Sequence, residues 1–320
     1  MKNVTPMKLR PSFKALTFAL AVLAIASMMA PLRAADTQGA ASTVASTLPI
    51  IGREQVSGTL WMQHAAEYGL VTEQVYGLAT AQLGKSMKAV GTAAVEQMAM
   101  DRKRLAKLPT AIIVDLDETV LDNSFYQARR ALQNGEYDEA SWQAWMQEAS
   151  APAIPGASRF LQAAAKAGHK IFYVTNRECR SLPDHPNDPC PARTATLKNL
   201  QALGLPNVID PGALSLRNER PEWASSNKSV RRAWIAQTHR IVALVGDDLR
   251  DFVDRPEFEA RRAELAPLFG ARWFILPNAL YGSWERVLIA GACEKGMSAE
   301  DCAAATTAKR YVALEASPKK

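Results

Sequence analysis

The sequence predicts an α/β fold in which a parallel sheet is flanked by helices. Four short apolar runs rich in β-branched residues predict strands that are buried on both faces. Helical stretches separate these runs, and the first two helices end just before Gly168 and Gly204, as helix C-termini often do. Strands that alternate with helices favour right-handed crossovers and a parallel sheet. The predicted strands are 111–114, 170–174, 241–245 and 273–276, and the predicted helices are 157–167, 192–203 and 229–239.

The first 34 residues have the three parts of a secretory signal peptide. Basic residues precede an apolar run at 15–30, and small residues surround the expected cleavage site after Ala34. A transmembrane anchor is the alternative, but this run of 16 residues is shorter than the roughly 20 needed to span a bilayer. No cysteine lies near the cleavage site to carry a lipid. We therefore expect a periplasmic or secreted protein with no membrane anchor after cleavage.

The net charge of the exported chain is expected to be close to zero. Five of the 38 basic residues and none of the 32 acidic residues lie within positions 1–34. Cleavage therefore removes most of the formal charge of +6. A chain without an excess of basic residues lacks the electrostatic attraction that holds a nucleic acid polymer, so we exclude that class of partner.

Composition divides the rest of the chain into four parts. A stretch rich in Ala, Ser and Thr has no apolar periodicity and predicts a flexible leader. A long helical pattern without proline predicts a helical extension before the first strand. The core carries an insertion with two tryptophans but no strand pattern, which predicts a small helical cap. These parts are the leader 35–52, the helical extension 53–108, the core 109–290 with its cap at 123–154, and the tail 291–320.

The chain has four cysteines, and an even number in an exported protein favours disulfides. Three pairings are open, and we expect the local one, Cys179–Cys190 with Cys293–Cys302. Closing the loop between Cys179 and Cys190 would stabilise the fold by about 3 kcal/mol on the chain-entropy model. Zinc binding with His185 is the alternative, but the spacing matches no zinc finger or ribbon.

Polar motifs follow three of the four predicted strands. In an open α/β sheet, ligands bind beyond the carboxyl ends of the strands. The order strand–DLDET, strand–TN, Lys, strand–GDDLRD is more specific than any single motif, because a lone D-x-D or Gly-Asp-Asp is common. We therefore predict one site at that edge of the sheet. The residues expected there are Asp115, Asp117, Thr175, Asn176, Lys228, Asp247 and Asp251.

The acidic residues of this site predict metal-dependent phosphoryl chemistry. Four carboxylates in one pocket would raise one another's pKa values, and a hard dication removes that conflict. Oxygen ligands with room for water suit Mg²⁺, which is the expected cofactor. Asp115 can attack phosphorus, and Asp117 can protonate the leaving oxygen and then activate water. Thr175 and Lys228 can hold the phosphoryl oxygens, so the sequence predicts a phosphatase for a small phosphomonoester.

At these residues the chain resembles the haloacid dehalogenase-like (HAD) superfamily, and within it the class C acid phosphatases. DLDETVLDNS at 115–124 and GDDLRDF at 246–252 resemble the two acidic signatures of that family. Members are exported bacterial enzymes, several of them outer-membrane lipoproteins that act on nucleoside monophosphates. The resemblance runs from Gln55 to the region of Trp284, and it also includes segments 60–68, 173–177, 227–229 and 276–282.

The resemblance implies a Rossmann-like HAD core and a role for each acidic residue. Asp115 would be the nucleophile that carries an aspartyl-phosphate, and Asp117 the acid and base. The metal would be held by the Asp115 carboxylate, the Asp117 backbone carbonyl and Asp247, with support from Asp251. Asp248 stands where Asn or Thr is usual, and we expect it to add charge near the metal. The loop 178–191 is longer than the usual connection and follows Thr175, so it is expected to reshape access for the substrate.

Aromatic side chains in the cap and the late loops are expected to set the substrate. Tyr126 and Tyr281 match motifs of the family, and with Trp142 and Asn176 they are the expected substrate contacts. Stacking against a nucleobase contributes about 1–3 kcal/mol per base. Trp142 and Trp145 lie three residues apart, so the core of the cap is an equally good interpretation of the two tryptophans.

These observations together predict an exported Mg²⁺-dependent acid phosphatase with a preference for nucleoside monophosphates, as in a 5'-nucleotidase. A dehalogenase relative is one alternative, although it has little use for Asp117 or a divalent ion. A nucleotide-binding or adhesion protein with little or no turnover is another, and the complete set of site residues argues against it. A phospho-acceptor signalling domain would have its acidic pair before the acceptor strand, whereas here the pair comes last. The oligomeric state is left open, with a homodimer as one option.

Overall fold

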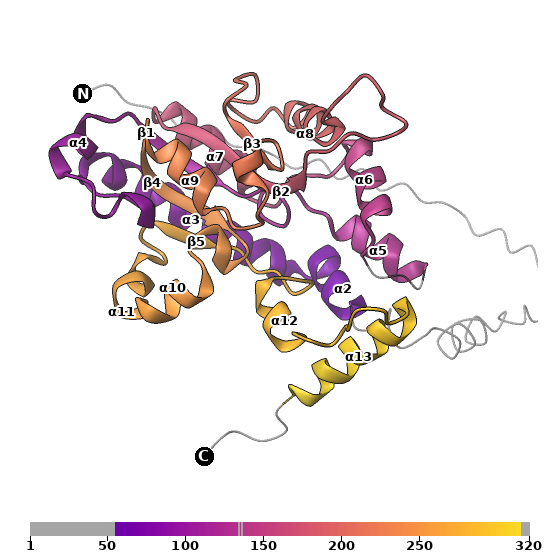
Figure 1. The fold of residues 1–320 in the computed structure, drawn as a ribbon. Helices are drawn as coiled ribbons and strands as arrows, with labels where there is room; N and C mark the ends of the chain where they lie inside the picture. The colour runs from indigo at the N-terminus through magenta and orange to yellow at the C-terminus, as the bar shows by residue number, and fades with distance from the viewer. Residues whose placement is uncertain (1–54, 134, 136, 315–320) are drawn as a thin grey trace, which may run out of the picture. The chain divides into compact units, whose positions relative to one another are not determined.

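The computed structural model describes residues 55–133, 135 and 137–314, which carry the sheet and the helices around it (Figure 1). The expected signal peptide, the expected leader and the end of the C-terminal tail lie outside the described residues. Within the part of the chain that the structure describes, no helix combines the length and apolar character needed to cross a membrane.

The sheet has five strands in the order β3-β2-β1-β4-β5, and every neighbouring pair is parallel. β1 lies in the centre, and its last residue, Val114, is paired with Tyr173 of β2 and Val245 of β4. The ends of these three strands therefore lie side by side. This arrangement confirms the predicted parallel α/β fold. The strands are β1 (Thr110–Val114), β2 (Lys170–Glu178), β3 (Leu214–Arg217), β4 (Arg240–Gly246) and β5 (Trp273–Ile275).

Two strand predictions were wrong in detail. β3 was not predicted, because it is a four-residue edge strand whose apolar residues alternate with Ser215 and Arg217. β2 was predicted to end at residue 174 but continues to Glu178, which is paired with Arg217 of β3 after an irregularity. Thr175, Asn176 and Arg177 therefore belong to the strand itself.

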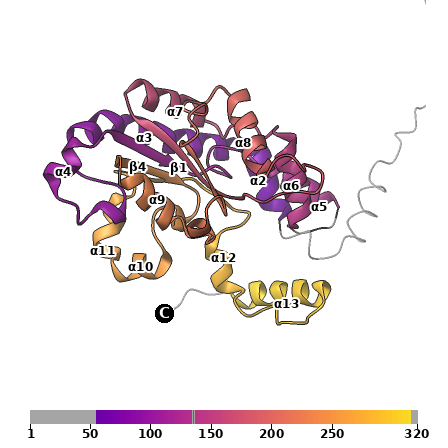
Figure 2. The same cartoon turned by 45° about the horizontal axis from the view of Figure 1, so that its top comes forward.

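Side chains of each strand alternate between two apolar cores, as a sheet covered on both faces requires. Ile112 and Val114 of β1 point to one core, whereas Ala111 and Ile113 point to the other. Burial of each large apolar side chain stabilises the fold by about 1.5–3 kcal/mol. The first core is covered by α3 (Ala66–Lys88), α7 (Ala157–Lys166) and α8 (Pro191–Ala202), and the second by α9 (Ser229–Ala236), α10 (Arg255–Ala260) and α11 (Arg262–Leu265) (Figures 1 and 2).

The N-terminal extension consists of separate helices. α2 (Val56–His64) is followed by α3. Beyond α3 the chain is no longer helical, and Ala93 N–H donates a hydrogen bond to Ile241 O of β4 at 2.7 Å. A short turn, η2 (Val95–Gln97), and α4 (Arg102–Lys107) complete the extension. The chain beyond α3 thus hydrogen-bonds to β4 instead of continuing as a helix, and the continuous helical pattern overestimated the helix.

The insertion between β1 and β2 forms the cap from α5 (Ser124–Leu132) and α6 (Glu139–Glu148), which lie beside each other in Figure 1. α6 packs against α8, and α5 packs against α2. The structure joins Cys179 to Cys190 and Cys293 to Cys302. The remaining elements are η3 (Pro221–Trp223), η4 (Leu249–Asp251), η5 (Ala266–Leu268), α12 (Ser283–Leu288) and α13 (Ala299–Val312).

Candidate active site

The candidate active site lies at the carboxyl edge of the sheet. Asp115 follows β1 directly, and its backbone N–H donates to Val245 O of β4 at 3.0 Å, which fixes the start of the loop. Asp247 follows β4, and Lys228 lies immediately before α9. The parallel register of β1 with β4 therefore brings Asp115 and Asp247 together although they lie more than a hundred positions apart, and the start of α9 brings Lys228 to them.

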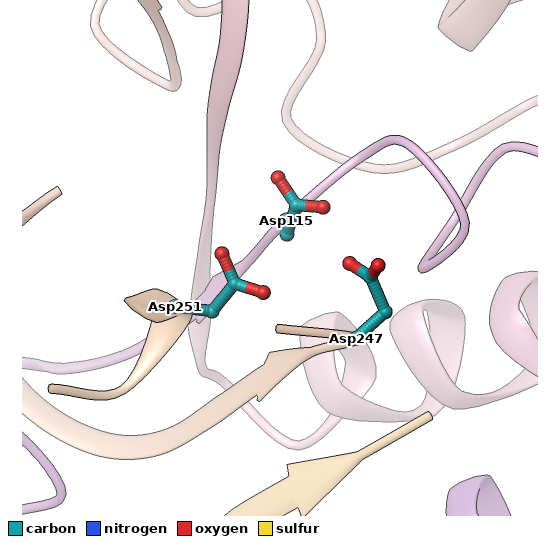
Figure 3. A group of neighbouring side chains, drawn as sticks. All are labelled: Asp115, Asp247 and Asp251. Carbon is teal, nitrogen blue, oxygen red and sulfur yellow. The ribbon is translucent and has the colours of Figure 1, made fainter. Parts of the chain in front are cut away.

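Three carboxylates share the centre of the site. Oxygens of Asp115, Asp247 and Asp251 all lie within 4.8 Å of one another, and Figure 3 shows the three groups turned toward a common space. The hydroxyl of Thr119 lies 3.3 Å from Asp115 Oδ2 and 3.2 Å from Asp247 Oδ1. Asn278 Nδ2 donates to the other oxygen of Asp247 at 2.8 Å. These contacts hold the carboxylates together although their charges repel.

Lys228 supplies positive charge to this cluster. Its ammonium contacts Asp115 Oδ1 and lies 2.6 Å from Asp251 Oδ1, and all three side chains are buried. Burial alone would disfavour the charged ammonium, but the two carboxylates outweigh that effect and raise the pKa of Lys228 above its ordinary value. The lysine is therefore charged at neutral pH and compensates one of the three carboxylates.

The remaining negative charge makes the cluster a good fit for a divalent cation. Burial, with Asp251 and Asp117 as further causes, raises the pKa of Asp115 to about 7, although Lys228 opposes the shift. Burial, with Asp251 and Asp115 as further causes, raises the pKa of Asp247 well above its ordinary value. A cation bound among these oxygens would relieve both the repulsion and the loss of hydration, and carboxylate oxygens are the ligands that hard dications prefer.

Asp117 does not join this cluster, contrary to the expected group of four carboxylates. Its Oδ1 accepts hydrogen bonds from Arg177 Nη2 at 2.8 Å, Arg177 Nε at 3.0 Å and Asn123 Nδ2 at 3.0 Å. Its Oδ2 accepts from the hydroxyl of Thr175 at 3.2 Å. Electrostatics explain the separation, because the fourth carboxylate gains a guanidinium partner by turning away from three like charges.

Thr175 and Asn176 lie at the end of β2 beside this pair. Thr175 is buried with its hydroxyl on Asp117, and Asn176 donates from Nδ2 to Ser226 O at 3.0 Å. Arg231 of α9 reaches both residues, since it donates to Thr175 O and, at 2.6 Å, to Asn176 Oδ1. These contacts connect β2 to the segment that carries Lys228.

The four aromatic candidates lie in different environments. Tyr126 is 2% exposed, and its hydroxyl lies 3.0 Å from Ser141 Oγ, so it packs inside the cap. Trp145 is also buried and donates from Nε1 to Asn123 Oδ1 at 2.8 Å. Trp142 is half-buried, with its ring centroid 5.8 Å from the guanidinium carbon of Arg177. Tyr281 is half-buried and donates its hydroxyl to Glu118. Trp142 and Tyr281 are thus partly exposed, whereas Tyr126 and Trp145 are buried.

Two residues of the first motif region have structural roles that the sequence did not reveal. Glu118 is fully buried at φ 58°, a left-handed conformation that is unusual outside glycine. Burial and the nearby Asp117 and Asp247 raise its pKa well above the ordinary value. Asn123 links Trp145 to Asp117 through its side-chain amide. Both residues lie inside the quoted motif, but only the folded geometry shows what they contact.

Asp248 is not one of the carboxylates of the cluster. Its carboxylate accepts hydrogen bonds from the Ser283 N–H and, at 2.6 Å, from the Ser283 hydroxyl. It also accepts from Arg250 N–H at 2.9 Å and begins η4 as an N-cap. These hydrogen bonds outweigh burial and lower the pKa of Asp248 below its usual value. The extra carboxylate therefore anchors the segment before α12.

Comparisons with known proteins agree with this geometry. A family model described as "HAD superfamily, subfamily IIIB (Acid phosphatase)" matches residues 17–284. "Acid phosphatase 1" of Solanum lycopersicum is 28% identical over 172 residues, and "Stem 31 kDa glycoprotein" of Glycine max is 25% identical over 179 residues. Each match covers 53% of this chain, and it spans 57% of the first protein and 58% of the second, so the likeness to these relatives extends over little more than half their length.

Solved structures extend the likeness over most of the chain. The class C acid phosphatase from Bacillus anthracis is similar with a TM-score of 0.65 and 27% sequence identity, over 84% of this chain and 99% of that one. The same enzyme with tungstate bound gives a TM-score of 0.66 at the same identity and coverage.

Proposed function

The chain belongs to the subfamily IIIB acid phosphatases of the HAD superfamily, which confirms the resemblance in its motifs, and we propose that it hydrolyses phosphomonoesters with Mg²⁺ through an aspartyl-phosphate on Asp115. The observation that carries the proposal is the cluster at the end of β1, where Asp115 lies among two further carboxylates and a buried lysine. An attacking carboxylate, a cation site and a fixed positive charge are the parts that phosphoryl transfer requires.

The reaction has two steps that use Asp115 and Asp117 in turn. In the first, a carboxylate oxygen of Asp115 attacks phosphorus, the bond from phosphorus to the ester oxygen breaks, and Asp117 gives its proton to that oxygen. In the second, a water oxygen attacks the phosphorus of the aspartyl-phosphate while Asp117 takes a proton from the water. The bond between phosphorus and Asp115 then breaks, which releases phosphate and restores the carboxylate. Lys228 stabilises the transferring phosphoryl oxygens with positive charge.

We propose Mg²⁺ as the cation, held by the carboxylates of Asp115 and Asp247 and the backbone carbonyl of Asp117, with Asp251 in support. The donor set is made of oxygens only, which suits magnesium better than softer transition metals. When bound, the cation supplies charge that draws the phosphoryl group toward Asp115. Asn278 and Thr119 orient Asp247 by hydrogen bonds and so shape the site in advance.

We propose that the preferred substrates are nucleoside monophosphates. Trp142 and Tyr281 offer half-buried rings that contact Arg177 and Glu118 of the site, and Asn176 follows Thr175 in β2. Stacking on one ring contributes about 1–3 kcal/mol per base. Tyr126 packs against Trp142 inside the cap, with the two rings edge-on at 5.0 Å between centroids, and so helps to hold the Trp142 ring in place. The two disulfides suit an exported protein, in agreement with the signal peptide expected at residues 1–34.

Phosphate release by the purified chain tests the proposal. The substrates are para-nitrophenyl phosphate and a set of nucleoside and sugar monophosphates, each with Mg²⁺ or with EDTA. We expect turnover that requires Mg²⁺ and is lost in Asp115→Asn. Asp122→Asn is the matched control, because Asp122 lies in the same loop and accepts from Ser124 N–H at 2.9 Å, a bond that asparagine can keep. Nucleotide binding without turnover in the wild type, or full activity in Asp115→Asn, would refute the proposed reaction.

A further inference from the structure

Arg177 is a buried arginine whose carboxylate partner is Asp117. It is 2% exposed, although it lies near the end of β2. Two of its nitrogens, Nε and Nη2, donate to Asp117 Oδ1, and Nε also lies 3.3 Å from Oδ2. An arginine fork that grips a carboxylate through more than one N–H fixes its direction as well as its distance. The contact therefore determines the rotamer of Asp117.

The guanidinium is itself held by its surroundings. Nη1 donates to the hydroxyl of Thr196 in α8 at 3.1 Å, and the guanidinium carbon lies over the ring of Trp142. The Arg177 N–H donates to Thr175 Oγ1, the same hydroxyl that donates to Asp117. Cys179, two residues later, is joined to Cys190 at the start of α8. The strand and helix that orient Arg177 are thus connected covalently and by hydrogen bonds.

The position of Arg177 matters because two positive groups compete for the carboxylate of Asp117, namely the guanidinium of Arg177 and a cation in the neighbouring cluster. Its backbone is two residues from Asp115, close enough for Asp117 to influence the Asp115 carboxylate electrostatically. A free carboxylate at this place would be attracted by a dication in the neighbouring cluster. A carboxylate bound to that cation could not deliver a proton to the leaving oxygen of a substrate. Thr175 and Asn123 also contact Asp117, but both are neutral.

We propose that Arg177 is a positioning residue that keeps Asp117 out of the cation cluster and directed at the leaving oxygen. This proposal rests on the proposed phosphatase reaction. In that reaction the bond from phosphorus to the ester oxygen breaks while the Asp117 proton moves to that oxygen. Without Arg177, the carboxylate of Asp117 turns toward the cation, and proton delivery is lost even though Asp115 can still attack.

Loss of proton delivery predicts a dependence on the leaving group. para-Nitrophenolate leaves readily without a proton, whereas the alkoxide of glycerol 2-phosphate requires one. General acid catalysis contributes about 10²- to 10⁴-fold where the leaving group needs it. A variant that misplaces Asp117 should therefore lose more activity on the alkyl ester than on the aryl ester. A variant that only loosens the fold should lose activity on both to the same extent.

The experiment compares kcat/KM for glycerol 2-phosphate and para-nitrophenyl phosphate at saturating Mg²⁺. In Arg177→Met we expect the ratio of alkyl to aryl activity to fall by about tenfold or more, as in Asp117→Asn. Arg231→Met is the matched control, because Arg231 is also buried and contacts the same part of β2 but is bound to Thr175 O and Asn176. Its ratio should stay at the wild-type value even if both activities fall.

Thr196→Val provides a second variant in case Arg177→Met fails to fold. It removes one hydrogen bond from the guanidinium at nearly constant side-chain volume. We expect its ratio to fall in the same direction by a few fold. An unchanged ratio in the folded Arg177 and Thr196 variants, or an equal fall in Arg231→Met, would overturn the positioning role. A wild type that hydrolyses neither ester would instead disprove the phosphatase reaction on which the proposal depends.

Magnesium binding measured by calorimetry without substrate gives a readout that does not depend on turnover. If Arg177 keeps Asp117 from the cation, Arg177→Met should bind Mg²⁺ more tightly than Arg231→Met, by about threefold or more. Both variants lose one buried positive charge, and Arg231 also interacts electrostatically with Asp115 and Asp251 of the cluster, so tighter binding by Arg177→Met than by Arg231→Met reflects more than the lost charge and points to the freed carboxylate. Equal affinities would overturn the claim that Arg177 separates Asp117 from the cation cluster.

Discussion

Replacement of Lys228 by methionine should destabilise the protein in a way that depends on pH and magnesium. The ammonium of Lys228 contacts two buried carboxylates, Asp115 and Asp251, and its own side chain is only 5% exposed. Removal of one partner from a buried ion pair costs about 3–5 kcal/mol, because the other charge stays buried without compensation. We expect a loss of this size in the free energy of unfolding at pH 8.5 in the presence of EDTA.

Protonation of Asp115 should reduce this loss as the pH falls. Burial already raises the pKa of Asp115 to about 7, and Lys228 is the largest effect that lowers it. The variant therefore has a still higher pKa, and its folded state takes up a proton at a higher pH than the wild type does. A carboxyl whose pKa is raised in the folded state loses stability as the pH rises. The difference between variant and wild type should thus grow by up to about 1.4 kcal/mol per unit as the pH rises above 7.

Magnesium should recover part of the loss, since the two positive charges of the dication balance most of the negative charge that the three carboxylates keep when the ammonium is absent. Unfolding by urea, followed by tryptophan fluorescence with and without Mg²⁺, measures all three effects. Lys198→Met is the matched control, because Lys198 is exposed on α8 and its replacement should change the free energy of unfolding by less than about 0.5 kcal/mol. A loss below about 1 kcal/mol at pH 8.5, or a loss that does not shrink toward pH 7, would refute this account of the cluster.

Three further substitutions test other parts of the site. Asp248→Ala should leave the magnesium affinity measured by calorimetry nearly unchanged, and it should lower the free energy of unfolding by about 0.5–2 kcal/mol, because it removes an N-cap. Glu118→Gln should cost less than about 1 kcal/mol in urea unfolding, because burial raises the pKa of Glu118 and so favours a neutral side chain there, whereas Glu118→Ala should cost about 2–3 kcal/mol by leaving the buried Asn123 N–H without its acceptor. The double variant Cys179→Ser/Cys190→Ser should lose about 3 kcal/mol in the same assay, since it frees a closed loop in the unfolded chain. A large change in the magnesium affinity of Asp248→Ala would contradict the first explanation, and an equal loss of stability in both Glu118 variants would contradict the second. An unchanged stability of the double serine variant would contradict the third.

The strands near the centre of the sheet could be predicted because burial on both faces requires a continuous apolar run. β1 and β4 are buried along almost their whole length, and their apolar residues form the predicted runs. β3 lies at the edge, where fewer side chains need to be apolar, so its four residues gave no signal. The end of β2 was missed for a different reason. Thr175, Asn176 and Arg177 are polar because their side chains hydrogen-bond within the site. A run of polar residues after an apolar run predicts a loop and not the end of a strand.

The meeting of Asp115, Lys228 and Asp247 could be predicted because it depends only on strand order in a parallel sheet and on the helix that leads back to β4. The orientation of their side chains could not. The sequence places Asp117 and Asp248 next to cluster residues, yet Asp117 turns to Arg177 and Asp248 turns to Ser283. Partners of this kind come from distant parts of the chain, and neither spacing nor composition reveals which carboxylate each one will take. Tyr126 gives the same lesson, since a motif position did not show that its ring is buried in the cap.

Lys228 and Arg177 bind different carboxylates of this site, and their charged groups differ in geometry. Lys228 presents a compact ammonium that can sit between Asp115 and Asp251 without fixing the direction of either, so both can still turn toward a cation. Arg177 presents a planar fork that holds Asp117 in one direction. In the proposed reaction, Asp115 needs freedom to approach phosphorus, whereas Asp117 needs a fixed position near the leaving oxygen. Exchange of the two residue types would therefore disturb each role, although the total charge of the site would stay the same.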